Sequence, residues 1–161
     1  MNQQIKDFWQ AYLNSLPSNT DKPERMPDPW HFCNDEESAN NLAELTLSGT
    51  KRATAGAVWS YEAESEAIPQ PGDLSIIINW QKEPVCIIET QQVDITPFNE
   101  VSEEFARVEG EGDKSLAYWK KVHWAFFSEE MEEIGRKTEE SMPVVCERFR
   151  VIYPETAAQP E

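Results

Sequence analysis

The chain has 161 residues, with 14 lysines and arginines against 30 aspartates and glutamates, which gives a formal net charge of −16. A charge of this sign and size repels a phosphate backbone at long range, so we exclude a protein that coats DNA or binds long duplexes. Hydrophobic residues make up 39% of the sequence, which is too many for a disordered chain, and the length corresponds to one domain.

The N-terminal sequence and the cysteines favour a cytoplasmic protein. No apolar segment follows the first seven residues, so no signal peptide is expected, and no apolar run is long enough to span a bilayer. Cys33, Cys86 and Cys146 form neither a CxxC pair nor a zinc motif. We expect reduced thiols that pack in the core, as is usual for proteins of the cytoplasm.

Two helices are predicted in the first third of the chain. An apolar pattern of helical spacing runs through residues 5–16, and a connector with four prolines follows at 17–29. Asn34 or Asp35 is suited to cap a second helix, and Gly49 lies where that helix would end.

Strands and helices alternate in the rest of the sequence. Four strands are expected, the middle two as a hairpin: 53–59, 74–80, 84–93 and 143–153. An acidic loop is expected at 61–71, and helices at 101–108, at 115–127 and from Ser128 onward, where a capping pattern recurs. The strands are too scattered for a parallel sheet with crossover helices. We therefore predict an α+β fold built on a small, partly open β-barrel that is decorated with helices.

The first candidate site is the segment 49–54, Gly-Thr-Lys-Arg-Ala-Thr. Lys51 and Arg52 form an isolated pair of cations in an acidic chain. One interpretation is that Lys51 interacts with the dipole at the end of the preceding helix. The other is that a bend in the chain brings Lys51 and Thr54 into one pocket. There a buried lysine with a lowered pKa would take the proton of the threonine hydroxyl and make it a nucleophile.

Two further segments could carry chemistry. Three carboxylates in the glycine-bearing segment 109–113 could form a solvated loop, hold a divalent cation or supply a general acid. The aromatic residues of 118–128 are typical of a helix that packs in the core, with a surplus ring available to stack on a base. His31 and His123 are the only histidines and lie far apart in the sequence, so we expect no zinc site.

Together these segments resemble the ASCH domain family. Residues 49–54 match its GxKxxT signature, and similar motifs follow in the same order at 71–73, 109–119, 123–128 and 142–149. The resemblance implies a PUA-like, partly open β-barrel with an added N-terminal helix. It predicts an N-terminal helix and connector at 1–29, an ASCH domain at 30–154 and a loose tail at 155–161.

The resemblance also implies an activity, because small ASCH members hydrolyse N4-acetylcytidine with a lysine, a threonine three residues later and a glutamate. These roles fall on Lys51, Thr54 and Glu109, with Glu111 as the second choice for the glutamate. Lys51 would deprotonate Thr54, and Glu109 would protonate the leaving amine. We therefore expect an amidohydrolase of N4-acylated cytosine nucleosides, with these residues contacting the substrate: Arg52, Trp59, Tyr61, Glu111, Trp124 and Ser128.

Other ASCH proteins are described as RNA-binding or RNA-cleaving, which leaves two alternatives. One is a binding module for single-stranded RNA, and the other is a metal-assisted ribonuclease in which segment 109–113 holds the cation. The net charge favours a neutral nucleoside over a polyanion. The expected hydrolase needs no cofactor and no metal. It is expected to bind neither duplex DNA nor a membrane and to be a monomer or a small homo-oligomer.

Overall fold

The computed structural model describes residues 2–154, which form two compact units. The first unit contains residues 2–49, 74–89 and 150–154, and the second contains residues 50–73 and 90–149. Two long strands, β4 (Pro84–Pro97) and β5 (Pro143–Tyr153), contribute residues to both. The tail expected at 155–161 lies outside the described residues.

One mixed sheet of five strands has the order β1-β3-β4-β5-β2. β1 (Pro29–Trp30) is parallel to β3 (Leu74–Ile78), β3 is antiparallel to β4, and β2 (Ala53–Ala57) is antiparallel to β5. Five α-helices accompany the open sheet in the described part of the chain. This architecture confirms the predicted α+β class and the added N-terminal helix, whereas the sequence did not predict the two-residue strand β1.

The first unit is built around α1 (Gln3–Ser15) and the β3–β4 hairpin. The side chain of Asn2 caps α1 by accepting a hydrogen bond from the Ile5 amide. α1 then buries a stripe of side chains at helical spacing against the isoleucines of the hairpin: Ile5, Trp9 and Tyr12 pack with Ile76, Ile78 and Ile87. α2 (Glu36–Leu47) begins after Asp35, which accepts from the Ser38 amide, as predicted.

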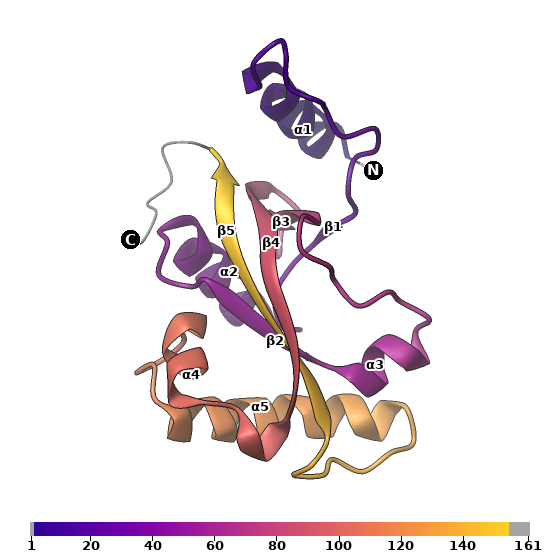
Figure 1. The fold of residues 1–161 in the computed structure, drawn as a ribbon, viewed down its shortest axis with the longest axis vertical. Helices are drawn as coiled ribbons and strands as arrows, with labels where there is room; N and C mark the ends of the chain where they lie inside the picture. Colours follow the sequence, from indigo (N-terminus) through magenta and orange to yellow (C-terminus); the bar gives the residue numbers. More distant parts are fainter. Residues whose placement is uncertain (1, 155–161) are drawn as a thin grey trace. The chain divides into compact units, whose positions relative to one another are not determined.

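The second unit combines β2 and most of β5 with three helices and a 3-10 turn (Phe98–Glu100): α3 (Val58–Ala63), α4 (Glu103–Glu109) and α5 (Leu116–Glu133). Figure 1 shows α4 and α5 beside the strands of this unit. Small side chains on one face of β2 and β5 leave room for the aromatic side chains of the helices. This core contains Ala53, Ala57, Val144, Phe105, Trp119 and Phe127.

Several predicted boundaries are wrong. β3 ends at Ile78 and not at residue 80, and β4 continues to Pro97 and does not end at residue 93. β2 ends at Ala57, and α3 occupies residues that were expected to continue a strand and begin a loop. α5 runs without a break past Ser128, because the stripe of buried side chains that includes Trp119 and Phe127 continues to Met131. No helix within residues 2–154 is long and apolar enough to span a membrane.

Candidate active site

The backbone brings the segment before β2 against the end of α4. Gly110 ends α4 in the left-handed conformation, with φ +73°. A Cβ at this position would clash with the carbonyl oxygen of Thr50, so only glycine permits this approach. The Arg52 amide donates to the carbonyl of Val108 at 3.0 Å. Residues 50–52 are thereby fixed beside the C-terminus of α4.

Lys51 is buried here, with 1% of its surface exposed, as the sequence predicted. Its ammonium donates to the carbonyl of Ala53 at 2.7 Å, to Glu111 Oε2 at 2.8 Å and to Glu109 Oε2 at 3.3 Å. The structure therefore brings together three of the predicted site residues, Lys51, Glu109 and Glu111. A buried ammonium bonded to two carboxylates does not fit the alternative of a solvated cation beside a helix end.

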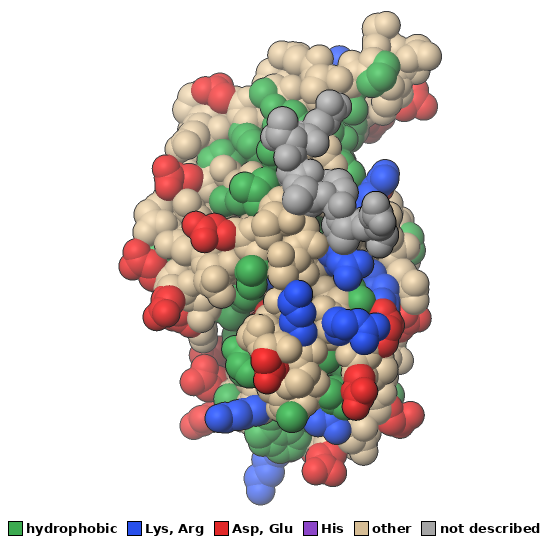
Figure 2. All heavy atoms as spheres, turned by 90° about the vertical axis from the view of Figure 1, so that its left-hand side faces the viewer, with side chains coloured by type: hydrophobic (Ala, Val, Ile, Leu, Met, Phe, Trp, Pro, Cys, Tyr) green, Lys and Arg blue, Asp and Glu red, His purple; other side chains and the backbone are tan. Residues whose placement is uncertain are grey.

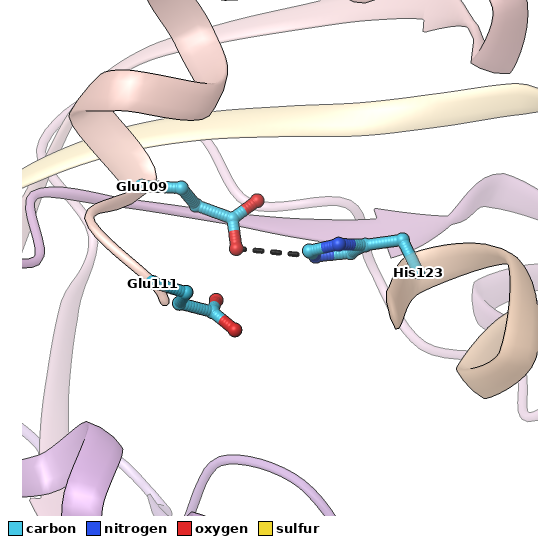
Figure 3. Close-up of side chains that lie close together, drawn as sticks. All are labelled: Glu109, Glu111 and His123. Carbon is cyan, nitrogen blue, oxygen red and sulfur yellow. Dashed lines mark hydrogen bonds and ion pairs between the residues drawn. The ribbon is translucent and has the colours of Figure 1, made fainter. Parts of the chain in front are cut away.

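Glu109 is bound on both of its oxygens. Oε1 accepts from the indole Nε1 of Trp119 at 2.7 Å, and Oε2 lies 3.1 Å from Nε2 of His123 (Figure 3). The other ring nitrogen of His123, Nδ1, lies 2.9 Å from the carbonyl oxygen of Trp119. A carbonyl only accepts, so Nδ1 carries a proton, and Nε2 needs a second proton to bond a carboxylate. His123 is therefore an imidazolium, and its ring stacks on Trp119 with the centroids 4.2 Å apart.

These ion pairs determine the pKa values of the three most buried groups. Burial lowers the pKa of Lys51, but the charges of Glu109 and Glu111 outweigh it and raise that pKa overall. Burial raises the pKa of Glu109, but His123 and Lys51 hold it well below its usual value. Burial likewise lowers the pKa of His123, and Glu109 reverses the shift. Near neutral pH Lys51 and Glu109 are therefore both charged, which is the opposite of what a lysine base and a protonated Glu109 require.

Glu111 behaves differently from Glu109. Its side chain is 13% exposed, and burial raises its pKa to about 7, with further contributions from a hydrogen bond to Glu109 and from the charge of Glu109. Figure 3 shows both carboxyl groups on the same side of the His123 ring. Of the two glutamates, Glu111 is therefore the one that gains and loses a proton near neutral pH.

The same cluster could be considered for a metal ion, because Glu109, Glu111 and His123 each offer one ligand atom within 4.8 Å of the others. However, the Lys51 ammonium is bonded to both carboxylates, and His123 Nε2 lies 3.1 Å from Glu109 Oε2, where a bond to the ionised carboxylate requires a proton on Nε2. A cation would have to displace Lys51 and a proton. The arrangement therefore favours an internally neutralised set of ion pairs over a metal site.

Thr54 lies one residue beyond the carbonyl that Lys51 binds, and its half-buried side chain is on the opposite face of β2 from the core residue Ala53. In the β2–β5 register Thr54 is directly opposite Glu147. Tyr61, on α3, covers the same face, because its ring would contact a Cβ at Gly56. Burial raises the pKa of Tyr61 to about 12, with the charge of Glu147 as the next cause, so the phenol is neutral at pH 7.

The other predicted substrate-binding residues lie outside this cluster. Arg52 is close enough to Glu104 to lower the pKa of that carboxylate, after the larger effects of Arg148. The ring of Trp59 is covered by the guanidinium of Arg136, 3.7 Å from its centroid. Trp124 is 37% exposed and contacts Phe98 edge to face, and Ser128 is half-buried on α5. These four residues remain predictions as substrate contacts.

Comparison with known proteins identifies the family. A family model of the ASCH domain matches residues 28–153. The chain belongs to the ASCH domain family. An ASCH domain from Lactobacillus crispatus JV V101 shares 40% identity at a TM-score of 0.90, with 95% of this chain and 96% of that chain covered. A protein from Enterococcus faecalis V583 shares 37% identity at a TM-score of 0.84, with 94% and 90% covered. No curated protein is significantly similar to the chain.

Three residues of this ASCH site were not predicted from the sequence: Trp119, His123 and Glu147. Trp119 and His123 lie four residues apart on the buried stripe of α5, where a histidine among apolar residues indicates a polar partner. Glu147 lies on β5 between Val145 and Phe149, which are both buried. In the sequence Glu147 alternates in step with Phe149 and Val151, and a carboxylate on such an apolar face indicates a functional residue.

Proposed function

We propose that this ASCH protein is an amidohydrolase that removes the acyl group from N4-acylated cytosine nucleosides. The observation that carries the proposal is the buried ammonium of Lys51, which is bonded to Glu111 at 2.8 Å and to the carbonyl before Thr54 at 2.7 Å. Neighbouring residues thus supply a cation, a carboxyl group that titrates near neutral pH and a hydroxyl. The GxKxxT signature at 49–54 and the net charge of −16 support a small neutral substrate.

In the proposed reaction, the hydroxyl oxygen of Thr54 attacks the acyl carbon of the amide. The ammonium of Lys51 stabilises the negative charge that develops on the acyl oxygen, since its carboxylate partners keep it protonated. Glu111, in its protonated form, gives its proton to the exocyclic nitrogen as the C–N bond breaks. Glu109 is fully bonded, so we assign it the task of holding Lys51 in place.

The test is to incubate the purified protein with N4-acetylcytidine and to quantify cytidine by chromatography. We expect turnover by the wild type, loss of it in Lys51→Ala and Thr54→Ala, and partial activity in Thr54→Ser, which keeps the hydroxyl. Lys121→Ala, which removes an exposed lysine on α5, is the matched control and should retain activity. Absence of turnover by the wild type, or full activity in Thr54→Ala, would contradict the proposal.

A second candidate, binding of single-stranded RNA, is favoured by one surface feature. Arg148, Arg107 and Arg52 all lie close enough to Glu104 to lower the pKa of its carboxylate. Figure 2 shows lysine and arginine side chains gathered on one face of the molecule. Binding to phosphates through these arginines would weaken steeply as salt increases, whereas turnover of a neutral nucleoside would not. Measuring both against salt concentration separates the two functions.

A further inference from the structure

A row of polar side chains crosses three neighbouring strands of the second unit. Thr54 on β2 is directly opposite Glu147 on β5, and Glu147 Oε2 accepts a hydrogen bond of 2.6 Å from the hydroxyl of Thr90 on β4. The three strands lie side by side in Figure 1. Glu147 is 5% exposed and Thr90 is 2% exposed, so the row is built into the sheet and does not belong to its solvated surface.

The strand register places Glu147 beside Thr54 on the same face of the sheet. The Phe149 amide donates to the carbonyl of Arg52, so residues 52 and 149 form a hydrogen-bonded pair. Two residues further along, Thr54 and Glu147 form the next such pair. The Cα atoms of such pairs are about 5.5 Å apart, and their side chains lie on the same face. In the described residues Glu147 is hydrogen-bonded to Thr90 and not to Thr54, and catalytic hydrogen bonds of this kind often tighten only when substrate is bound.

We propose that Glu147 is the general base that takes the proton of Thr54, a catalytic role that rests on the proposed function. The arrangement follows the logic of a nucleophile, a base and a group that orients the base. Thr54 is the nucleophile, Glu147 the base and Thr90 the orienting group. This assignment supplies the proton acceptor that Lys51 cannot provide, since its ammonium is kept protonated by Glu109 and Glu111.

The reaction balances with these groups and water. Glu147 takes the proton of Thr54, the oxygen forms a bond to the acyl carbon, and the C–N bond breaks as Glu111 gives its proton to nitrogen. This step leaves the free nucleoside and an acyl ester on Thr54. Water then attacks the ester, losing its proton to the Glu111 carboxylate, and Glu147 returns its proton to the oxygen of Thr54. The products are the nucleoside and a carboxylic acid.

The charged groups around Glu147 determine how strong a base it is. Burial is the largest effect and raises the pKa of Glu147, and the charge of Asp73 raises it further. The hydrogen bond from Thr90 and the charge of Lys51 lower this pKa, but the net shift is upward. Tyr61, on α3, is also near enough to interact with its charge. A carboxylate with a raised pKa is a stronger base than a solvated one and is still ionised above that pKa.

The experiment compares variants on two substrates, N4-acetylcytidine and 4-nitrophenyl acetate. The nitrophenolate of the ester leaves without a proton, whereas the amine of N4-acetylcytidine needs one. Glu147→Gln keeps the shape and the bond to Thr90 but cannot accept a proton, so kcat should fall about 10²-fold or more on both substrates. Glu111→Gln should slow formation of the acyl-enzyme, measured as the burst of released leaving group, far more for the amide than for the ester. Glu130→Gln is the matched control, because Glu130 is also a partly buried carboxylate with a raised pKa but bonds Ser60 instead.

Thr90→Val provides a readout that a purely structural role of Glu147 would not change. Loss of the hydroxyl removes a bond that lowers the pKa of Glu147, so the acid limb of the kcat profile should move to higher pH. If Glu147→Gln does not fold, Thr90→Val and Glu147→Asp still test the role of Glu147 as the base. Wild-type turnover with full activity in Glu147→Gln, or an unmoved acid limb in Thr90→Val, overturns the assignment of Glu147 alone. Absence of wild-type turnover of the nucleoside overturns the proposed function and this assignment together.

Discussion

Replacing Glu109 by glutamine should cost stability, whereas the same replacement at Glu111 should cost activity. Glu109 is 1% exposed and is the carboxylate partner of both Lys51 and His123. Glu109→Gln leaves two buried cations short of a negative charge. Glu111 has a pKa of about 7, so at pH 6 it is mostly protonated, and glutamine replaces one neutral group by another.

The magnitude follows from the contacts. Removing one member of a buried ion pair typically costs about 3–5 kcal/mol. In Glu109→Gln the Trp119 indole can still donate to the amide oxygen of the new side chain, and Lys51 keeps its bond to Glu111, so we expect the lower end, about 3 kcal/mol. For a chain of this size that corresponds to a decrease of about 6–12 °C in Tm. We expect Glu111→Gln to change stability by less than about 1 kcal/mol.

Urea unfolding at pH 6, followed by tryptophan fluorescence, measures both variants against the wild type. Because the pKa of Glu109 is lowered on folding, its contribution is complete above the usual value of 4.5 and is lost as the pH falls through the lower folded value. The difference between wild type and Glu109→Gln should therefore shrink in acid. An unchanged urea midpoint for Glu109→Gln, or a larger loss for Glu111→Gln, would refute the account of the cluster.

Three further outcomes are expected. The kcat for N4-acetylcytidine should fall above about pH 7 as Glu111 loses its proton, and a pH-rate profile without that limb would exclude Glu111 as the acid. Gly110→Ala should lower Tm and activity more than Gly72→Ala. Both glycines have a positive φ, but only at Gly110 would the added Cβ meet backbone atoms. Equal melting temperatures of the two variants would count against the close approach of Thr50 to Gly110. A thiol reagent should label one cysteine of the native protein, the half-buried Cys33, because burial raises the pKa of the other two to about 12.

Local patterns predicted the elements well where one interaction dominates. The spacing of Ile5, Trp9 and Tyr12 predicted α1, and Asn34 or Asp35 was expected to cap α2, which Asp35 does. β5 was predicted with its observed bounds. The end of β2 was missed, because the turn into α3 has no capping side chain at Ala57. Without a capping side chain, the local sequence does not show where β2 ends and α3 begins.

For the candidate site, the sequence indicated which residues are chemically active but not their charge states. Lys51 and Glu109 were predicted from the motifs, the lysine as a base with a pKa lowered by burial and the glutamate as a protonated general acid. In the folded structure both pKa values shift in the opposite direction, because each group is a partner of the other and His123 adds a second cation. Such coupling depends on side chains up to 60 positions apart, and only the folded structure brings these together.

The spacing of the cluster along the chain has a consequence for the order of folding. The bonds of Glu109 to Trp119 and His123 span only 10 and 14 positions, whereas its bond to Lys51 spans 58. Each doubling of a loop costs about 0.6 kcal/mol in closure entropy, so closing the longer loop costs about 1.2–1.5 kcal/mol more. The pairing of carboxylate with imidazolium can therefore form with the α4–α5 hairpin, before β2 docks. Lys51 then completes a site whose negative charge is already in position.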